Sequence, residues 1–418
     1  MVNVCDAIMG NGKSQSAITY MNEHKDQRFV YITPYLEEAA RIKQGCPDLD
    51  FIEPTDKLKK FGFTKAKHTA SLLKEGRNIT TTHQSFKNYT EDMLDDVKRW
   101  GYTLIIDESV DVLEGANISD SDIQILVAGG YLEYVGGMIR ATGKPYGGGV
   151  FGDFIKFVKL RDIVYVKGGD DMYMYYWLLP PRLFTAFSDV FILTYLFKSQ
   201  SIHHFLQIYE IPYRYIGIEK IDGGTGFRFS EDPHCYTPPY VKRLSDMIHI
   251  LDRKKLNEIG DSRCALSMNW YNNSKHVEQL KKNVSNCIQN VWRDVPAEQK
   301  MWGVFKSDFQ KMRGKGYTKA YLVFNARATN EYRNKDHLIY LSNIFINPND
   351  AMFYEQHGVQ VDDDMYALSI MVQWIWRSAI RDGKEIYLYI PSKRMRTILQ
   401  NWIEATSKGG VACGGDEV

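Results

Sequence analysis

The chain has 418 residues, of which 44% are hydrophobic and 25% charged, and its formal net charge is +1. This length suits two or three domains, and the near neutrality gives no overall basicity, so any nucleic-acid-binding surface must be local. The six cysteines form no C-x-x-C pair, which speaks against a zinc site or a disulfide framework and favours a reducing cytoplasm. No apolar stretch suffices to span a membrane, and because the first residues resemble a core strand we expect no signal peptide.

The first motif joins an apolar strand to a glycine-containing loop and Lys13-Ser14, followed by a predicted helix over residues 15–22. This order is that of a P-loop, whose backbone N–H groups surround phosphate oxygens at a helix N-terminus. Lys13 would reach the β- and γ-phosphates of a nucleotide, and the Ser14 hydroxyl would bind Mg²⁺. A glycine-rich turn beside a chance Lys-Ser is the alternative. The predicted nucleotide-binding residues are Ala7, Met9, Gly10, Asn11, Gly12, Lys13, Ser14 and Gln15.

Strands and helices then alternate, which predicts a parallel, doubly wound α/β sheet with functional groups at the carboxyl ends of its strands. We expect strands over residues 28–32, 78–82 and 102–106, and helices over residues 36–42 and 65–74.

The strand over residues 102–106 runs directly into Asp107 and Glu108. An apolar strand ending in Asp-Glu is typical of the acidic half of a nucleoside triphosphatase site. Asp107 would hold Mg²⁺, and Glu108 would orient or deprotonate the attacking water. The alternative is that Asp107 and Glu108 are simply two exposed acids at a strand end. The upstream P-loop motif argues against this alternative.

The alternation fails from residue 111 to about residue 184, and we interpret this segment as an α+β insertion in the first domain. Residues 111–131 could form a helix, and residues 163–166 and 172–177 read as a hairpin. The tyrosines and tryptophan here could stack on bases, although a small aromatic core explains them as well. Strands over residues 189–195 and 213–218, with a short helix over 205–208, complete the first domain.

A second alternating half follows the glycine-rich residues 222–226, which predicts domains over residues 1–225 and 226–418. The second half contains no further P-loop. We expect helices over residues 247–259, 274–290, 363–381 and 393–405, and strands over residues 263–268, 317–324 and 385–390.

The predicted helix over residues 363–381 carries Gln373, Arg377 and Arg381. Large apolar residues surround these positions, which indicates a mostly buried helix, and buried arginines need partners such as phosphate. We expect Arg377 and Arg381, four residues apart on one helix face, to stabilise transition-state charge on a nucleotide lying between the two halves. Solvated helix arginines are the alternative.

Together, these motifs resemble a superfamily 2 (DEAD/DEAH-like) helicase of the compact kind found in bacteriophage genomes. The resemblance implies two RecA-like domains, ATP and Mg²⁺ as ligands, and contacts to a nucleic-acid backbone. Ser109 and Trp376 depart from the family pattern, which usually has Ala and Gly there, and the two arginines are four rather than three residues apart. The matching segments are residues 7–14 (motif I), 33–34 (Ia), 80–83 (the T-T-x strand end), 107–109 (II), 193–195 (III), 328–330 (V) and 373–381 (VI). The implied nucleic-acid contacts are Thr33, Pro34, Thr82, His83 and Thr329.

We therefore expect an ATP-dependent helicase or translocase acting on DNA more than on RNA, in phage replication or recombination, with the insertion available to replication proteins. One alternative is a phage DNA-packaging ATPase of the terminase type. Its second domain would be a nuclease with clustered acids, for which residues 362–364 are the one candidate. Another is a non-hydrolysing, nucleotide-regulated nucleic-acid-binding protein, against which Glu108 argues.

Overall fold

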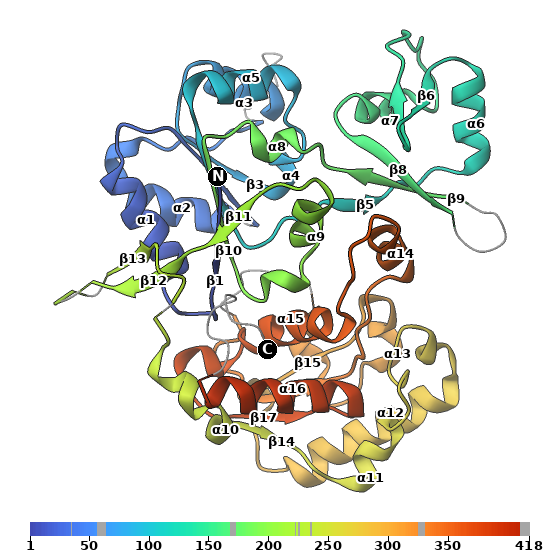
Figure 1. Ribbon diagram of the computed structural model, residues 1–418. Helices are drawn as coiled ribbons and strands as arrows, with labels where there is room; N and C mark the ends of the chain where they lie inside the picture. Colours follow the sequence, from blue (N-terminus) through green and yellow to red (C-terminus); the bar gives the residue numbers. More distant parts are fainter. Residues whose placement is uncertain are drawn as a thin grey trace. The chain divides into compact units, whose positions relative to one another are not determined.

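The computed structural model describes residues 1–34, 36–56, 64–167, 173–221, 223–224, 226–234, 236–324 and 331–409 (Figure 1). The chain forms two compact units. Unit 1 comprises Met1–Asp6, Gly12–Pro233 and Asn347–Val361, and unit 2 comprises Ala7–Asn11, His234–Ile346 and Asp362–Val418. Within the described ranges, no helix is long and apolar enough to cross a membrane.

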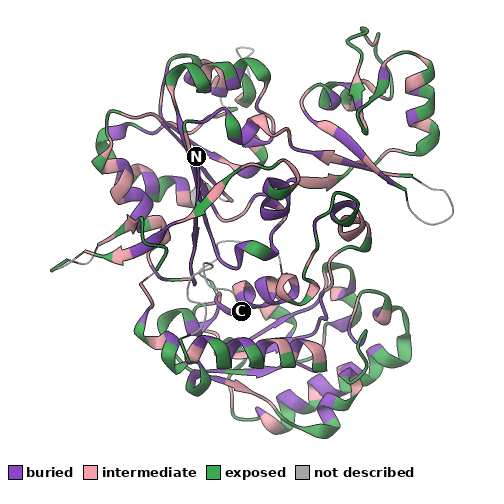
Figure 2. Cartoon of the chain, viewed as in Figure 1, coloured by how far each residue is buried: buried purple, intermediate pink, exposed green. Residues whose placement is uncertain are grey.

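Unit 1 is built on a six-stranded sheet in which every neighbouring pair is parallel. Its strand order is β11-β1-β10-β4-β2-β3. Strands β1, β2 and β4 are buried along their whole length, as Figure 2 shows for β1, because helices cover both faces of such a sheet. The strands are β1 (Val2–Asp6), β2 (Phe29–Thr33), β3 (Ile79–Thr82), β4 (Thr103–Asp107), β10 (Asp189–Thr194) and β11 (Tyr213–Tyr215).

Threonines begin three of the helices of unit 1. The hydroxyls of Thr64, Thr82 and Thr90 each accept a backbone N–H from the first turn of the helix that follows. The P-loop helix instead has Gly12 as its N-cap, which has no side chain to cap the first turn. The helices are α1 (Lys13–Glu23), α2 (Leu36–Gly45), α3 (Lys65–Lys74), α4 (His83–Phe86), α5 (Glu91–Trp100), α8 (Arg182–Thr185) and α9 (Ser201–Ile208).

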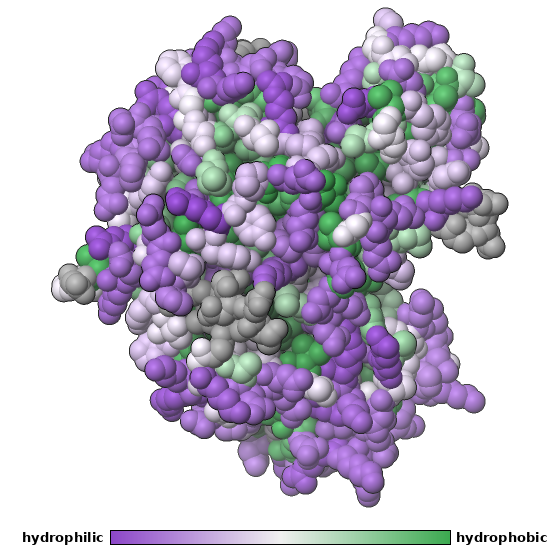
Figure 3. Space-filling view, in the orientation of Figure 1, coloured by the Kyte–Doolittle hydropathy of each residue, from purple (hydrophilic) through white to green (hydrophobic). Residues whose placement is uncertain are grey.

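The insertion has its own five-stranded sheet, in the order β5-β9-β8-β7-β6, and its own core around Ile123, Ile139 and Ile163. The predicted hairpin is confirmed, since β8 and β9 pair antiparallel. Hydrophilic residues dominate the face of the molecule in Figure 3, yet the insertion exposes large apolar side chains such as Ile125, Tyr134 and Phe157. Its elements are β5 (Leu113–Gly115), α6 (Asp120–Ala128), β6 (Leu132–Val135), β7 (Met138–Ala141), α7 (Gly152–Val158), β8 (Asp162–Lys167) and β9 (Tyr173–Leu178).

Two further segments complete unit 1. An antiparallel hairpin of β12 (Gly217–Lys220) and β13 (Phe227–Ser230) follows β11 and packs along α1. Helix α14 (Pro348–Gln356) comes from far along the chain, and its Tyr354 ring lies 4.8 Å from the His204 ring of α9.

Unit 2 contains a four-stranded parallel sheet in the order β14-β17-β16-β15. Its core includes Trp302, Ile339 and Tyr389, one from each of three strands. The predicted fold class, two parallel α/β sheets with an α+β insertion in the first, is thereby confirmed. The elements are α10 (Leu244–Met247), β14 (Ile248–Ile250), α11 (Lys254–Asn257), α12 (Ser274–Asn286), β15 (Lys300–Gly303), α13 (Phe309–Met312), β16 (His337–Tyr340), α15 (Asp363–Ile375), β17 (Ile386–Tyr389) and α16 (Lys393–Ser407).

Several predicted elements are wrong. The helix over residues 247–259 is interrupted by β14, and the helix over residues 111–131 loses its first third to β5, because each short strand completes a sheet edge. The strand over residues 263–268 is a series of turns. The strand over residues 317–324 is a 3₁₀ turn (Thr318–Ala320) joined to β15 by a single bridge between Tyr321 and Trp302. The strand over residues 213–218 is split between β11 and β12.

Candidate active site

Two glycines shape the loop between β1 and α1. Gly10 and Gly12 have φ values of +82° and +98°, in the left-handed region that only glycine enters without strain. The helix begins at once, because Ser16 N–H donates to Gly12 O over 2.8 Å. Asn11 between them is fully buried, and neither polar atom of its side chain has a hydrogen-bond partner in the described part of the chain. Two left-handed glycines in one loop let the backbone turn as a phosphate-binding loop must, and the P-loop itself stays a prediction.

Ser14 and Asp107, 93 residues apart, meet at the start of α1 and the end of β4. The Ser14 hydroxyl donates to the Asp107 carboxylate, with Oγ 3.2 Å from Oδ2 and 3.4 Å from Oδ1. Two adjacent ligands of an octahedral Mg²⁺ lie about 3 Å apart, so this hydroxyl and carboxylate suit Mg²⁺ in both chemistry and spacing. These two predicted metal ligands are thus brought together.

Two side chains hold Asp107 in place: Tyr31, which was not predicted at this site, and His83, which was predicted as a nucleic-acid contact. The hydroxyl of Tyr31, from β2, donates to Asp107 Oδ2 over 2.8 Å. Burial, and then the charge and hydrogen bond of Asp107, raise the pKa of Tyr31 well above its usual range, so the phenol stays protonated and donates. His83 Nε2 lies 3.1 Å from Asp107 O, which ties the start of α4 to the end of β4. An isolated tyrosine within an apolar strand gave no signal of this contact.

Glu108 turns away from the strand that precedes it. Its φ is +62°, a value rare outside glycine, and its N–H donates to Leu193 O on β10 over 3.0 Å. Backbone strain of this kind is concentrated at functional sites. The half-buried Glu108 follows the metal-ligand candidate directly, as expected of a residue that acts on a water beside the γ-phosphate.

The strand end of β10 carries a polar network of its own. Gln200 Nε2 donates to Thr194 Oγ1 over 2.5 Å and to Tyr195 O over 2.9 Å. Asp6, the last residue of β1, accepts the N–H of Phe197 over 3.0 Å. The hydroxyl expected at motif III is therefore present and hydrogen-bonded, and Asp6 and Gln200 were not anticipated.

In unit 2 a tyrosine contacts the first part of the P-loop. Tyr240 Oη donates to Met9 O over 2.9 Å. Burial raises the pKa of Tyr240, and the nearby positive charge of Arg381 lowers it only in part. Arg381 thus lies close enough to influence the tyrosine that touches Met9.

The predicted arginine helix ends earlier than expected. Helix α15 stops at Ile375, Arg377 lies beyond it, and Arg381 belongs to a separate 3₁₀ turn (Ala379–Asp382). The two arginines therefore do not share one helix face, which corrects that part of the prediction. Arg381 is exposed, and Gln373 and Arg377 are half-buried.

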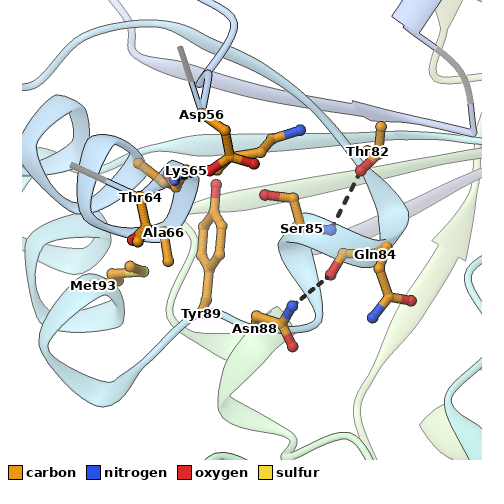
Figure 4. A pocket seen from close by; sticks show the side chains of 11 residues that line it. Asp56, Thr64, Lys65, Ala66, Thr82, Gln84, Ser85, Asn88, Tyr89 and Met93 are labelled. Carbon is orange, nitrogen blue, oxygen red and sulfur yellow. Dashed lines mark hydrogen bonds between the residues drawn. The ribbon is translucent and has the colours of Figure 1, made fainter. Parts of the chain in front are cut away.

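The predicted nucleic-acid contacts have different environments. Thr33 is buried at the end of β2, and Pro34 beside it is half-buried. Thr82 caps α4 and lines a pocket of about 320 Å³, whose wall also includes Lys65, Ser85 and Asn88 (Figure 4). His83 is buried beneath this edge. Thr329, and with it residues 328–330, lie outside the described residues.

The acidic residues 362–364 are engaged within unit 2. Asp362 caps α15 by accepting the N–H groups of Asp364 and Met365. Arg394 pairs with Asp363 over 3.0 Å and with Asp364 over 2.7 Å. Among the described residues, no group of three or more His, Cys, Asp or Glu side chains could hold a metal ion. These acids therefore act as a helix start and an ion pair.

The chain matches one curated relative along nearly its whole length. It is 34% identical over 414 residues to the SPbeta prophage-derived uncharacterized protein YonV of Bacillus subtilis (strain 168), which covers 96% of this chain and 98% of the relative. Residues 242–403 match the family described as the YonV C-terminal Rossmann-like domain.

Among solved structures, the chain resembles an XPD helicase with a TM-score of 0.45 and 9% identity, covering 96% of this chain and 94% of the other. It also resembles Xpd4 of S. tokodaii with a TM-score of 0.40 and 9% identity, covering 96% and 94%. At this level of identity and superposition, these two resemblances carry no weight for function.

Proposed function

The chain belongs to the YonV family, and we propose that it is an ATP-dependent motor that moves along or unwinds nucleic acid. The prophage origin of the Bacillus subtilis relative supports a phage setting, with DNA replication or recombination as the process. DNA is the proposed track, and RNA is the alternative.

The proximity of Ser14 to Asp107, with Glu108 next in the chain, carries this proposal. A P-loop hydroxyl 3.2 Å from a strand-end carboxylate is the arrangement that nucleoside triphosphatases use to hold Mg²⁺. Binding of a nucleotide alone would not need a second carboxylate, held at a strained φ, beside that pair. These features favour hydrolysis over simple nucleotide binding.

Each residue of the site has a proposed role. Mg²⁺, held by Ser14 and Asp107, would neutralise charge on the β- and γ-phosphates. Lys13 would contact the same phosphates, and the backbone of residues 7–12 and Gln15 at the helix start would surround them. Glu108 would orient the attacking water or accept its proton.

Unit 2 would supply positive charge to the transition state. Arg381 is our preferred arginine finger because it is exposed and its charge reaches Tyr240, the tyrosine that contacts Met9. Gln373 near the end of α15 and Arg377 just beyond that helix, both half-buried, would support it. In this proposal the nucleotide is bound by both units, and its hydrolysis drives their relative movement.

The protein would bind nucleic acid through contacts to the sugar-phosphate backbone. The pocket beside Thr82 offers hydroxyl, amide and lysine groups from Thr82, Ser85, Asn88 and Lys65, which suit phosphate and sugar without reading bases. Thr33, Pro34, His83 and Thr329 remain proposed parts of this surface or its support.

The proposal is tested by measuring ATP turnover of the full chain alone and with single-stranded DNA, duplex DNA or RNA. We expect nucleic acid to stimulate turnover, and Lys13→Ala to abolish it. Lys25→Ala, at an exposed lysine paired with Asp48, should leave turnover unchanged. Absence of turnover under all conditions would favour the non-hydrolysing alternative, and metal-dependent cutting of DNA would favour the nuclease-containing packaging ATPase.

A further inference from the structure

An aromatic ring from the β12–β13 hairpin touches the P-loop. A Cβ atom added to Gly12 would lie 2.4 Å from Cγ of Phe227, so this ring is in direct contact with the glycine that begins α1. Phe227 is half-buried, and Gly12, which its ring contacts, directly precedes Lys13. The nucleotide roles proposed above do not use this ring.

The hairpin is fixed in position by a second aromatic residue. Phe229 is two residues along β13 and therefore projects from the same face as Phe227. Its ring stacks on Phe191 of β10, with centroids 5.3 Å apart and planes inclined by 16°. Tyr20 on α1 lies 6.1 Å from the same ring. This packing pre-organises Phe227 at the loop and lowers the entropic cost of using its ring as a binding surface.

The sheet order indicates which end of a nucleotide would reach Phe227. Asp107 ends β4, which is separated from β1 by β10, so the metal end of the site points to that side of the P-loop. The hairpin continues from β11, which lies on the opposite side of β1. A phosphate chain held at Ser14 and Asp107 would therefore direct its sugar and base toward the hairpin.

We propose that Phe227 forms the nucleobase subsite of the P-loop and stacks on the purine ring of the bound nucleotide. This inference rests on the proposed nucleotide site and specifies how its ligand is chosen. A phenyl ring presents a π-face without hydrogen-bonding groups, so it favours large bases over small ones but distinguishes poorly between adenine and guanine. ATP and GTP should bind with similar affinity, and both should bind more tightly than CTP or UTP.

The test compares ATP with inorganic tripolyphosphate, which carries the phosphates without a base. Dissociation constants of both ligands are measured by calorimetry in Mg²⁺ for the full-length wild type and for Phe227→Ala, Phe227→Leu and Phe227→Trp. We expect the Ala and Leu variants to bind ATP about tenfold more weakly, the loss of one stacked base, while Trp restores binding. Tripolyphosphate should bind equally to all four proteins. The Leu variant keeps an apolar contact with Gly12. Thermal unfolding identifies any variant that fails to fold. If the Ala variant does not fold, the comparison of ATP binding between the Leu and Trp variants tests the inference.

Three outcomes would overturn the inference. Equal loss of ATP and tripolyphosphate binding in the Leu variant would show that Phe227 only shapes the loop. Unchanged ATP binding in the Ala and Leu variants would remove any role for the ring. If the wild type binds neither ligand, the proposed function fails together with the inference. In the first two outcomes the wild type still binds ATP, so only the inference about Phe227 fails.

Discussion

At the scale of single residues, the site depends on how Asp107 is held. Its carboxylate receives hydrogen bonds from Ser14 and Tyr31, and its backbone carbonyl lies beside His83. Groups that hold a metal ligand in orientation typically matter almost as much as the ligand, because a rotated carboxylate presents the wrong oxygen. Tyr31 is the clearest case, since its hydroxyl donates to the carboxylate itself.

We predict that Tyr31→Phe raises the Mg²⁺ concentration needed for half-maximal ATP turnover by about tenfold. The substitution removes the 2.8 Å hydrogen bond to Asp107 while keeping the buried ring. A Mg²⁺ titration of steady-state turnover checks this. The matched control is Tyr340→Phe, which removes a buried hydroxyl that has no hydrogen-bond partner in the described part of the chain. Equal Mg²⁺ dependence of the wild type and the Tyr31 variant would contradict the role given to Tyr31.

At the scale of elements, the insertion is joined to the parallel sheet by an ionic cluster of two buried cations and one partly exposed carboxylate. Glu114 on β5 pairs with Lys87, which follows α4, and with Arg161, which precedes β8. The side chains of Lys87 and Arg161 are only 6% and 4% exposed, so both cations depend on one carboxylate. Burial alone would raise the pKa of Glu114, but the hydrogen bonds and charges of Lys87 and Arg161 outweigh it and hold the pKa below its usual range.

We predict that Glu114→Gln loosens the insertion by about 2 kcal/mol, because it leaves two buried cations without a counter-charge; the cost is below that of a fully buried pair because the Glu114 side chain is 37% exposed. Faster hydrogen exchange of the β8 and β9 amides at pH 7 would report this, with the exposed Glu133→Gln on β6 as control. The stabilisation is complete above the ordinary glutamate pKa of about 4.3 and is lost as pH falls through the lower folded value. The two proteins should therefore converge in stability in acid. A difference that persists or grows in acid would contradict this.

The elements also show why the sequence predicted one half of the fold better than the other. Strands such as Phe29–Thr33 and Thr103–Asp107 are continuous apolar runs, so their type and order could be inferred. Strand β15 was not predicted because it begins with a charged residue, Lys300. This lysine is nevertheless buried, and its Nζ donates a hydrogen bond to Val295 O. Its length of four residues gave no periodicity to detect. Conversely, Ala265 and Leu266 were predicted as strand residues because they are apolar. They are indeed buried, but they lie in turns.

The residues of the candidate site also divide into those that local sequence patterns predicted and those that they did not. Ser14 and Asp107 follow strands whose ends could be predicted, so their meeting was foreseeable. Tyr31, Phe227 and Tyr240 reach the site through register and packing between distant segments, which no local pattern encodes. The end of α15 before Arg377 was missed because the apolar pattern continues through Ile380.

At the scale of the whole molecule, the proposal requires that unit 2 take part in hydrolysis. We predict that Arg381→Ala lowers nucleic-acid-stimulated turnover at least a hundredfold while ATP affinity changes less than threefold, because an arginine finger acts on transition-state charge. Turnover and equilibrium ATP binding are measured in parallel. Arg293→Ala, at another exposed arginine of unit 2, is the control. A drop in ATP affinity as large as the drop in turnover would assign Arg381 to nucleotide binding instead.

The most direct test of the motor is the turnover of Glu108→Gln in the presence of single-stranded DNA. The amide keeps the size of the side chain but cannot accept the proton of the attacking water. We predict that stimulated turnover falls by a factor of about 10² or more, while ATP binding persists and wild-type folding is retained. Turnover equal to that of the wild type would contradict the assignment of Glu108 and, with it, the hydrolytic site.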